Sequence, residues 1–315
     1  MVLDSLPLNP GDLDWTPLRE LGDLTLFENT SPAEVAERVR DADVVYTNKV
    51  RVRADALGAA SNLKLVSVLA TGYDIIDLDA ARQQGVTVCN VPAYGTNSVA
   101  QTTIALLLEL THHAGAHDAA IRDGQWQRAG FFSFWNYPLV ELADKTLLIV
   151  GMGAIGSKVA QIATALGMKV SAAQLPGRTA SGQAAYPRVP LQEALPQADV
   201  ISLHTPLTPE TRALINAERL SQMKQTALLL NTARGLLVDE AALAEALRDG
   251  RIAGYAADVL STEPPASDNP LFNAPHCNLT PHLSWASFES RQRLMNASVE
   301  NLRAFLLGKP QNVVS

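Results

Sequence analysis

Three charged or titratable side chains, Arg234, Glu263 and His282, each follow closely after a short apolar run of the chain. An arginine binds a carboxylate in a two-pronged geometry and polarises a neighbouring ketone. A histidine can give a proton to a ketone oxygen, and a carboxylate beside it orients the imidazole and favours its protonated form. Together they predict reduction of the ketone of a small 2-oxo acid, with His282 as proton donor, Arg234 as carboxylate-binding group and Glu263 as partner of the histidine.

Each of these side chains also has a structural explanation. Arg234 could form a surface ion pair, and Glu263, which precedes two prolines, could be an exposed loop acid. His282 could be a hydrogen-bonded structural histidine. We favour the catalytic interpretation because a dinucleotide-binding motif precedes all three residues.

That motif is Gly151-Met152-Gly153-Ala154-Ile155-Gly156, which follows an apolar run and begins an apolar helical pattern. Gly151 would form the tight turn, Gly153 would let the backbone approach a pyrophosphate, and Gly156 would allow close packing of helix on sheet. The pyrophosphate would lie at the helix N-terminus, near the amides of Ala154 and Ile155. The sequence therefore predicts NAD or NADP as cofactor.

The choice between these cofactors depends on the end of the next expected strand, where an acidic residue usually holds the adenosine ribose. Here that position is Gln174, which does not repel a 2'-phosphate. Arg178 could pair with such a phosphate, or could equally be a solvated loop residue. The sequence thus favours NADP and leaves NAD open.

The elements that must position these residues alternate between short apolar runs and helical patterns. This alternation predicts an α/β protein with two doubly wound sheets of parallel strands. The expected strands are 24–27, 44–47, 63–69, 86–90, 146–150, 169–174, 200–204, 227–231, 254–258 and 278–280. The expected helices are 32–40, with Ser31 as N-cap, then 54–60, 78–84, 98–112 and 286–307, the last packing on the first unit.

The segment 115–144 is unusually aromatic for this chain. Its aromatic residues are Trp126, Phe131, Phe132, Phe134, Trp135 and Tyr137. They predict either an association surface or an arm that packs in the core, and the sequence does not decide between the two.

The composition sets further bounds. A chain of 315 residues exceeds the usual size of one hydrophobic core, and its net charge of -7 gives no reason to expect nucleic acid or an anionic membrane as partner. Cys89 and Cys277 lack metal-ligand spacing, so we expect packing residues, no metal site and a reducing compartment. No secretory signal or spanning apolar run is evident, which favours a cytoplasmic protein.

With these motifs in hand, the chain resembles the D-isomer-specific 2-hydroxyacid dehydrogenase family. The resemblance rests on Gly151 to Gly156, His204 to Thr208, Asn231 to Gly235, Glu263 and Thr280 to Ser287. It implies a Rossmann nucleotide domain, residues 99–286, inserted into a flavodoxin-like substrate domain, residues 1–98 and 287–315. It also implies a homodimer and the catalytic group Arg234, Glu263 and His282.

The resemblance implies further binding residues. The backbone amides of Leu69, Ala70, Thr71 and Gly72 would hold the substrate carboxylate, although this segment could be a simple strand-to-turn connection. The further cofactor contacts would be Thr205, Pro206, Thr232, Ala233 and Asp258. Within the family, residues 134–138 and 280–287 are most similar to glycerate dehydrogenases, also called hydroxypyruvate reductases. Gln101 and Gln174 depart from the acidic residues common in the family.

Three alternatives remain. A phosphoglycerate dehydrogenase is disfavoured, because it would carry an additional regulatory domain and only a short tail follows Leu307. A formate dehydrogenase is disfavoured, because those enzymes pair the histidine with glutamine, where this chain has Glu263. Some relatives are corepressors, so a dinucleotide-sensing binding module is the alternative to an enzyme.

Overall fold

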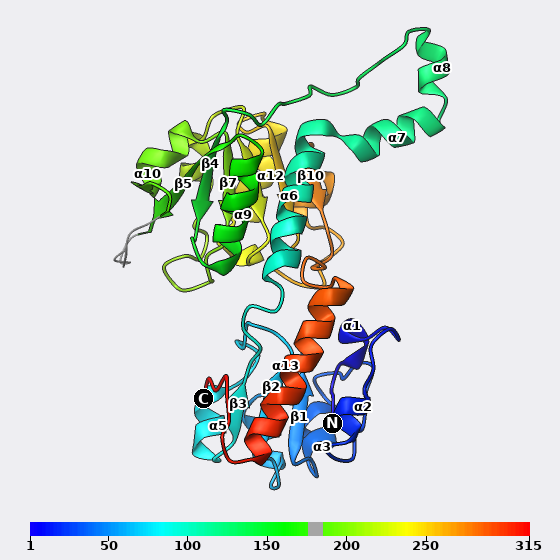
Figure 1. Ribbon diagram of the computed structural model, residues 1–315. Helices are drawn as coiled ribbons and strands as arrows, with labels where there is room; N and C mark the ends of the chain where they lie inside the picture. The colour runs from blue at the N-terminus through cyan, green and yellow to red at the C-terminus, as the bar shows by residue number, and fades with distance from the viewer. Residues whose placement is uncertain (176–184) are drawn as a thin grey trace. The chain divides into compact units, whose positions relative to one another are not determined.

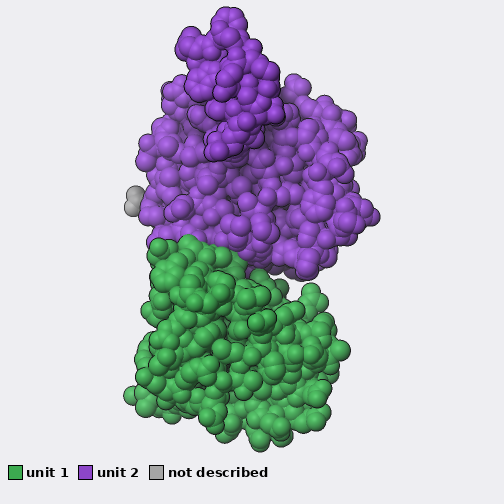
Figure 2. All heavy atoms as spheres, turned by 90° about the vertical axis from the view of Figure 1, so that its right-hand side faces the viewer, with its two compact units in different colours: residues 1–95, 285–315 green, residues 96–284 purple. Residues whose placement is uncertain are grey.

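The computed structural model describes residues 1–175 and 185–315, which form two compact units. Unit 1 comprises Met1–Gly95 and Trp285–Ser315, and unit 2 comprises Thr96–Ser284 (Figure 2). The two boundaries between these units were expected from the sequence after residues 98 and 286. The assignment of a substrate role to unit 1 and a nucleotide role to unit 2 stays a prediction.

The sheet of unit 1 contains the parallel strands β1 (Val44–Thr47), β2 (Leu65–Val68) and β3 (Thr87–Cys89) in that order. Val2 extends it, because it forms parallel bridges to both Tyr46 of β1 and Leu26. The resulting order, Leu26, Val2, β1, β2, β3, is the flavodoxin-like order expected for this unit.

The expected strand at 24–27 is wrong, since only the isolated bridge at Leu26 forms there. The N-terminal segment that contains Val2 does not continue as a strand, because a helix begins at Ser5. The carboxylate of Asp4 accepts hydrogen bonds from the backbone N–H groups of residues 48, 49 and 50. Val2 itself, at the centre of this extension, was missed by the sequence pattern.

Helices cover both faces of this sheet. Val45 and Val66 pack with α3 (Val35–Val39), α4 (Ala54–Ala59) and α5 (Leu78–Gln83), while Tyr46 and Leu65 pack with α13 (Phe288–Leu306). The closing helix therefore returns to unit 1, as expected. The short helices α1 (Ser5–Leu8) and α2 (Thr16–Arg19) complete the unit.

The predicted N-cap at Ser31 is wrong. The side chain of Glu34 instead accepts hydrogen bonds from the backbone N–H and the hydroxyl of Ser31, at 2.9 and 2.6 Å. Residues 32–34 form a turn, so α3 begins only at Val35.

In the described part of unit 2, the sheet has seven parallel strands in the order β10-β9-β8-β7-β4-β5-β6. This is the Rossmann order with one more strand at the edge, and the order reverses between β4 and β7. The strands are β4 (Thr146–Val150), β5 (Lys169–Gln174), β6 (Arg188–Pro190), β7 (Val200–Leu203), β8 (Leu228–Asn231), β9 (Gly254–Ala257) and β10 (Cys277–Leu279). The pattern missed β6, a three-residue edge strand that ends in a proline.

Two cores on opposite faces make this sheet doubly wound. Leu147 and Ile149 of β4 pack with α6 (Thr96–His112) and α9 (Ala154–Ala165), whereas Leu148 and Val150 pack on the other face. That second face is covered by α10 (Leu191–Ala194), α11 (Ala217–Gln222), α12 (Glu240–Arg248) and the 3-10 turns η1 (Leu195–Gln197), η2 (Gly235–Leu237) and η3 (Pro270–Asn273). Because successive side chains of β4 point to opposite faces of the sheet, this one buried strand contributes to both cores.

An arm made of α7 (Ala114–Arg122), α8 (Gln125–Ala129) and the residues up to 138 extends away from the sheet of unit 2 (Figure 1). Neither helix contains a buried residue, and the side chains of Phe131, Phe132 and Trp135 are 77%, 91% and 67% exposed. Tyr137 packs against His113, with ring centroids 4.6 Å apart. The interpretation of these aromatics as core-packing residues is therefore wrong for the three exposed rings.

No helix among residues 1–175 and 185–315 is long and apolar enough to span a membrane. Both cysteines are free thiols, and burial raises the pKa of Cys89 to about 11 and that of Cys277 to about 12. They are protonated at neutral pH, as expected of packing residues.

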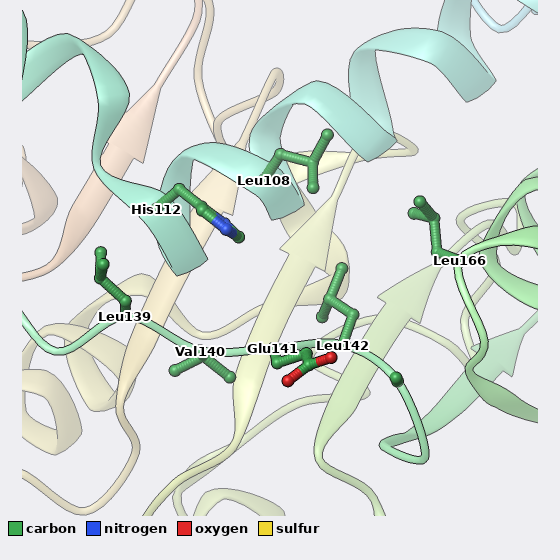
Figure 3. A pocket seen from close by; sticks show the side chains of 8 residues that line it. Leu108, His112, Leu139, Val140, Glu141, Leu142 and Leu166 are labelled. Atoms are coloured by element: carbon green, nitrogen blue, oxygen red, sulfur yellow. The ribbon is translucent and has the colours of Figure 1, made fainter.

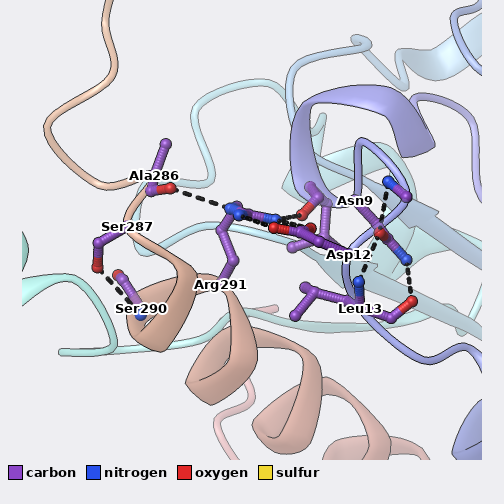
Figure 4. A network of polar contacts seen from close by, with 9 residues as sticks. Asn9, Asp12, Leu13, Ala286, Ser287, Ser290 and Arg291 are labelled. Atoms are coloured by element: carbon purple, nitrogen blue, oxygen red, sulfur yellow. Dashed lines mark hydrogen bonds and ion pairs between the residues drawn. The ribbon is translucent and has the colours of Figure 1, made fainter.

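One ion pair fastens the start of α13 to the N-terminal segment of unit 1 (Figure 4). Arg291 donates through both terminal nitrogens to the carboxylate oxygens of Asp12, each at 2.6 Å, and also to the backbone oxygens of Leu8 and Ala286. These hydrogen bonds hold the pKa of Asp12 below its ordinary value and raise the pKa of Arg291.

The lowered pKa of Asp12 predicts a pH-dependent contribution to stability. A group whose pKa is lower in the folded state stabilises above its unfolded pKa, and this contribution is lost as the pH falls through the folded pKa. We expect Asp12→Asn to lower the free energy of unfolding at neutral pH, with the difference from the parent shrinking once the pH drops below about 4. The measurement is urea unfolding across this pH range.

Asp23→Asn, at another exposed carboxylate of unit 1, is the control. Burial raises the pKa of Asp4, which acts in the opposite direction but is common to both proteins and cancels in the difference. A difference between Asp12→Asn and the parent that stays constant with pH would contradict the assignment.

Candidate functional site

The candidate site residues of unit 2 lie at one edge of its sheet. Since every strand pair is parallel, the carboxyl ends of β4, β7, β8, β9 and β10 share that edge. The segments that leave it are 151–156, 204–206, 232–235, 258–263 and 280–284. Residues separated by more than 100 positions in the chain are brought together by this topology.

His282 and Glu263 form a hydrogen-bonded pair. The imidazole Nδ1 lies 2.6 Å from Oε2 of Glu263, and the two side chains are 24% and 36% exposed. An ionised carboxylate can only accept, so Nδ1 carries a proton in this pair. Nε2 is therefore the ring nitrogen available to a reacting group. The other carboxylate oxygen of Glu263 accepts from the backbone N–H of Leu260 at 3.0 Å.

Asp258 fixes the segment that carries His282. Its carboxylate has no exposed surface and accepts from the hydroxyl of Thr280 at 2.6 Å and from the backbone N–H groups of Leu283 and Ser284 at 2.9 and 2.8 Å. His282 lies between these contacts with φ of +52°. That left-handed conformation is uncommon for a residue with a side chain, and the flanking bonds to Asp258 maintain it.

Asn231 fixes the turn that carries Arg234. Its fully buried side chain donates to the backbone oxygen of Arg234 at 2.9 Å and accepts from the N–H of Ala233 at 3.1 Å. The guanidinium of Arg234 is partly exposed and donates to the backbone oxygen of Ala233 at 2.8 Å. The turn is rigid, and the charged group remains accessible.

Gly235 brings this turn against the Glu263 segment. A Cβ atom at Gly235 would lie 1.9 Å from the carbonyl carbon of Leu260, closer than any side chain can come. Only glycine allows the two backbones to pass at this distance. The segments of Arg234 and Glu263 are thereby held side by side.

The glycine motif fits a dinucleotide. Gly151 has φ of +105°, and a Cβ there would lie 2.6 Å from the carbonyl carbon of His204, while a Cβ at Gly156 would lie 2.2 Å from the backbone oxygen of Gly151. At Gly153 a Cβ would meet nothing within 4 Å. Gly153 is also the N-cap of α9 and provides no side-chain cap, so the helix N-terminus has open space in front of it. This is the arrangement that accommodates a pyrophosphate.

A second observation supports a ligand at this edge. Thr205, directly after β7, is 1% exposed, and its hydroxyl has no hydrogen-bond partner within the described residues. Buried hydroxyl groups are rarely left without a hydrogen bond, so we expect a ligand to supply the partner there. Pro206, next to it, is exposed.

The other cofactor residues expected from the sequence have varied surroundings. Gln174 is exposed at the end of β5, whereas Arg178 lies outside the described residues. The hydroxyl of Thr232 lies 2.8 Å from that of Thr103 on α6. Ala233 is held by Asn231, and Asp258 by the His282 segment, so the structure gives Asp258 an anchoring role. Their contacts with cofactor stay predictions.

In unit 1 the segment Leu69 to Gly72 has its carbonyl groups tied back. The backbone oxygens of Leu69, Ala70 and Thr71 accept from Asn48, Val91 and Asn90 at 2.5, 3.0 and 2.7 Å. The N–H of Leu69 already donates to the backbone oxygen of Thr47 at 2.8 Å, so its predicted role is wrong, whereas the N–H groups of residues 70–72 find no acceptor in the described part of the chain. Such a row of amides is a potential site for a carboxylate.

Sequence reasoning gave no role to Asn231, Gly235 or Thr103. Asn231 and Gly235 flank Arg234 at spacings that could have indicated a constrained turn. Nothing in the sequence distinguishes Thr103, which is one polar residue within a long helix.

A separate pocket of about 460 Å³ contains none of these residues (Figure 3). It lies between the end of α6 and the segment after the arm, and Leu108, Leu139 and Leu142 contribute to a mostly aliphatic lining. Its polar lining residues are His112 and Glu141, and the predicted carboxylate-binding and proton-donating side chains do not line it.

Comparisons with known proteins agree with this geometry. The family model described as "D-isomer specific 2-hydroxyacid dehydrogenase, NAD binding domain" matches residues 104–284. A hydroxypyruvate reductase from Blautia hydrogenotrophica is 46% identical, covering 100% of this chain and 99% of that protein. A glycerate dehydrogenase from Methylorubrum extorquens is 44% identical, covering 91% of this chain and 90% of the relative.

Among solved structures, the NADPH-dependent glyoxylate/hydroxypyruvate reductase of Sinorhizobium meliloti has a TM-score of 0.85 at 28% identity, covering 100% of this chain and 96% of that one. The resemblance inferred from the motifs is confirmed, as is the fold class. The family match over more than half of the chain, together with similarity along its full length, shows that the chain belongs to the D-isomer-specific 2-hydroxyacid dehydrogenase family.

Proposed function

We propose that this enzyme reduces small 2-oxo acids, hydroxypyruvate or glyoxylate, to the D-2-hydroxy acid with NADPH or NADH. The observation that carries the proposal is the 2.6 Å pair of His282 and Glu263 at the edge of the sheet, beside the Arg234 turn. The relatives named hydroxypyruvate reductase and glycerate dehydrogenase support the same substrates.

Each residue has one task in this reaction. When bound along the glycine motif, the nicotinamide cofactor supplies the hydride. Arg234 binds the substrate carboxylate and polarises the ketone. His282 donates the proton on Nε2 to the ketone oxygen, because Nδ1 is already committed to Glu263. Glu263 accepts the hydrogen bond from Nδ1, which orients the ring and leaves Nε2 to the substrate.

The amides of residues 70–72 in unit 1 are a second candidate contact for the substrate carboxylate. Their lack of acceptors in the described part of the chain supports this role, since an unpaired backbone N–H bonds readily to an anion. The substrate domain is then unit 1, and the nucleotide domain is unit 2.

We also infer that NADPH is accepted at least as well as NADH. Gln174 ends β5 without a carboxylate, so nothing at that residue repels a 2'-phosphate.

The two free cysteines support a location in a reducing compartment, the cytoplasm.

The working form in this proposal is a homodimer associated through the arm. The exposed parts of Phe131, Phe132 and Trp135 in two copies would bury roughly 700 to 1,200 Å² in total, which is at the lower end of the size of a specific interface. Leu108 and Leu139 of the pocket in Figure 3 are 38% and 56% exposed, so a partner copy could cover these side chains as well. A two-fold dimer would cover both copies of the surface at once.

The proton donor is tested by His282→Ala. We expect turnover of hydroxypyruvate to fall by about two to four orders of magnitude, the range for loss of general acid catalysis, while the dissociation constant of NADPH is unchanged. His276→Ala, at an exposed histidine of unit 2, is the control and should keep parental turnover. Turnover of His282→Ala within a few-fold of the parent would remove this residue from the mechanism.

Cofactor choice is tested by Gln174→Asp. A carboxylate at this strand end would repel the 2'-phosphate and should shift the preference toward NADH by about 1 to 3 kcal/mol. The measurement is kcat/KM for both cofactors, and Gln197→Asp, which adds the same charge next to Thr146 at the other end of β4, is the control. A parent strongly selective for NADH that does not respond to the substitution would show that Gln174 does not govern the choice.

The dimer is tested by replacing Phe131, Phe132 and Trp135 together with serine. Sedimentation equilibrium should show a dimeric parent and a monomeric triple variant of unchanged secondary structure. Leu307→Ser, at a side chain 78% exposed in unit 1, should remain dimeric. A monomeric parent, or a triple variant that still forms dimers, would refute the proposed interface.

A further inference from the structure

Glu240, in the first turn of α12, accepts three hydrogen bonds from the segment between β9 and η3. Its Oε1 accepts from the backbone N–H of Ser261 at 2.5 Å, and its Oε2 accepts from the hydroxyl of Ser261 and from Nδ2 of Asn269, both at 2.8 Å. Both carboxylate oxygens are thus used, on two residues eight positions apart. Hydrogen bonds to an ionised carboxylate are roughly twice as strong as neutral ones.

The segment held in this way carries Glu263. Ser261 lies two residues before it, and the adjacent Leu260 donates its backbone N–H to Oε1 of Glu263. Glu263 therefore lies between the two anchor points, Ser261 and Asn269. Its other oxygen is the one bonded to His282.

The same segment is also held from the side of Arg234. The backbone of Leu260 and Ser261 passes so close to Gly235 that a Cβ there would lie 1.9 Å from the carbonyl carbon of Leu260. Residues 234–240 thus contact the Glu263 segment twice, by close backbone approach at Gly235 and by the carboxylate of Glu240. This stretch begins with Arg234, so one rigid connection relates the predicted carboxylate-binding group to the partner of the predicted proton donor.

Helix stability alone does not account for Glu240. The N-cap of α12 is Asp239, whose carboxylate accepts from the backbone N–H groups of Ala241 and Ala242. Glu240 is partly buried and directs its oxygens to the neighbouring segment. Asp239 therefore caps the helix, and Glu240 fixes the Glu263 segment.

We propose that Glu240 is a positioning residue for the reaction, acting through Glu263 on the orientation of His282. This inference rests on the proposed function, because it takes His282 and Glu263 as catalytic. Without Glu240, Ser261 and Asn269 lose their shared acceptor, the segment can move, and Glu263 no longer holds the imidazole in its reactive orientation. A displacement of about 1 Å can lower a rate by about 100-fold.

A double-mutant cycle tests the proposal, with the rate of a single turnover of hydroxypyruvate by bound NADPH as the readout. We expect Glu240→Ala to lower this rate by about 10- to 100-fold without changing the dissociation constant of NADPH. In a Glu263→Ala background the same substitution should have little further effect, because the residue through which it acts is gone. A role in general stability would instead lower the rate by the same factor in both backgrounds.

Two further variants keep the test independent of folding. Glu240→Gln keeps one oxygen for the N–H of Ser261 but loses the acceptor for Asn269, so its rate should lie between those of the parent and Glu240→Ala. Asp239→Ala removes the helix cap alone and should lower the melting temperature while leaving the rate unchanged.

The outcomes separate this inference from the proposed function. Losses that multiply in the double variant overturn the positioning role of Glu240 and leave the catalytic group intact. A Glu263→Ala enzyme with the parental rate overturns both, since Glu263 would then have no part in the reaction. An equal rate loss in Asp239→Ala and Glu240→Ala also overturns the positioning role.

Discussion

The candidate site depends on one buried charge, the carboxylate of Asp258. Removing a carboxylate from water costs several kcal/mol unless its oxygens are hydrogen-bonded. The hydroxyl of Thr280 and the amides of Leu283 and Ser284 meet this requirement, so the segment after β10 has one stable conformation. His282 is held within that segment at φ of +52°, a conformation that its own backbone would rarely adopt.

Contacts with neighbouring segments also fix the other parts of the site. Asn231 holds the turn of Arg234, Gly235 lets that turn approach the Glu263 segment, and the glycine motif leaves the N-terminus of α9 open. The accessible groups that remain are the guanidinium, the imidazole and the helix amides. In the proposed function they serve as a carboxylate-binding group, a proton donor and a phosphate site, as reduction of a 2-oxo acid by a dinucleotide requires.

Much of this could be predicted from the sequence, for identifiable reasons. The apolar run from Leu147 to Val150 predicted a buried parallel strand over residues 146–150, which is observed at those bounds, because a strand covered on both faces needs apolar residues throughout. The catalytic candidates followed from residue type and from their position after such runs. The pair of His282 with Glu263, predicted from these residue types and implied again by the resemblance, is present in the structure.

The features that the sequence did not predict are those determined by tertiary contacts. Residues 24–27 have a strand-like composition, but only an isolated bridge between Leu26 and Val2 forms there, because a helix begins at Ser5 and ends the extended N-terminal segment. Serine is a residue type favoured at helix N-caps, yet the hydroxyl of Ser31 donates a hydrogen bond to the carboxylate of Glu34 instead. The roles of Gly235 and Glu240 depend on which segment lies opposite them, and no local pattern contains that information.

In the proposed mechanism this edge of the sheet binds a 2-oxo acid for reduction, with His282 as the proton donor. A crystal structure with NADP+ and D-glycerate tests this most directly. We expect the glycerate carboxylate on Arg234 and its 2-hydroxyl about 2.6 to 3.2 Å from Nε2 of His282. A product bound elsewhere, or with the 2-hydroxyl turned away from His282 in a complex competent for turnover, would contradict it.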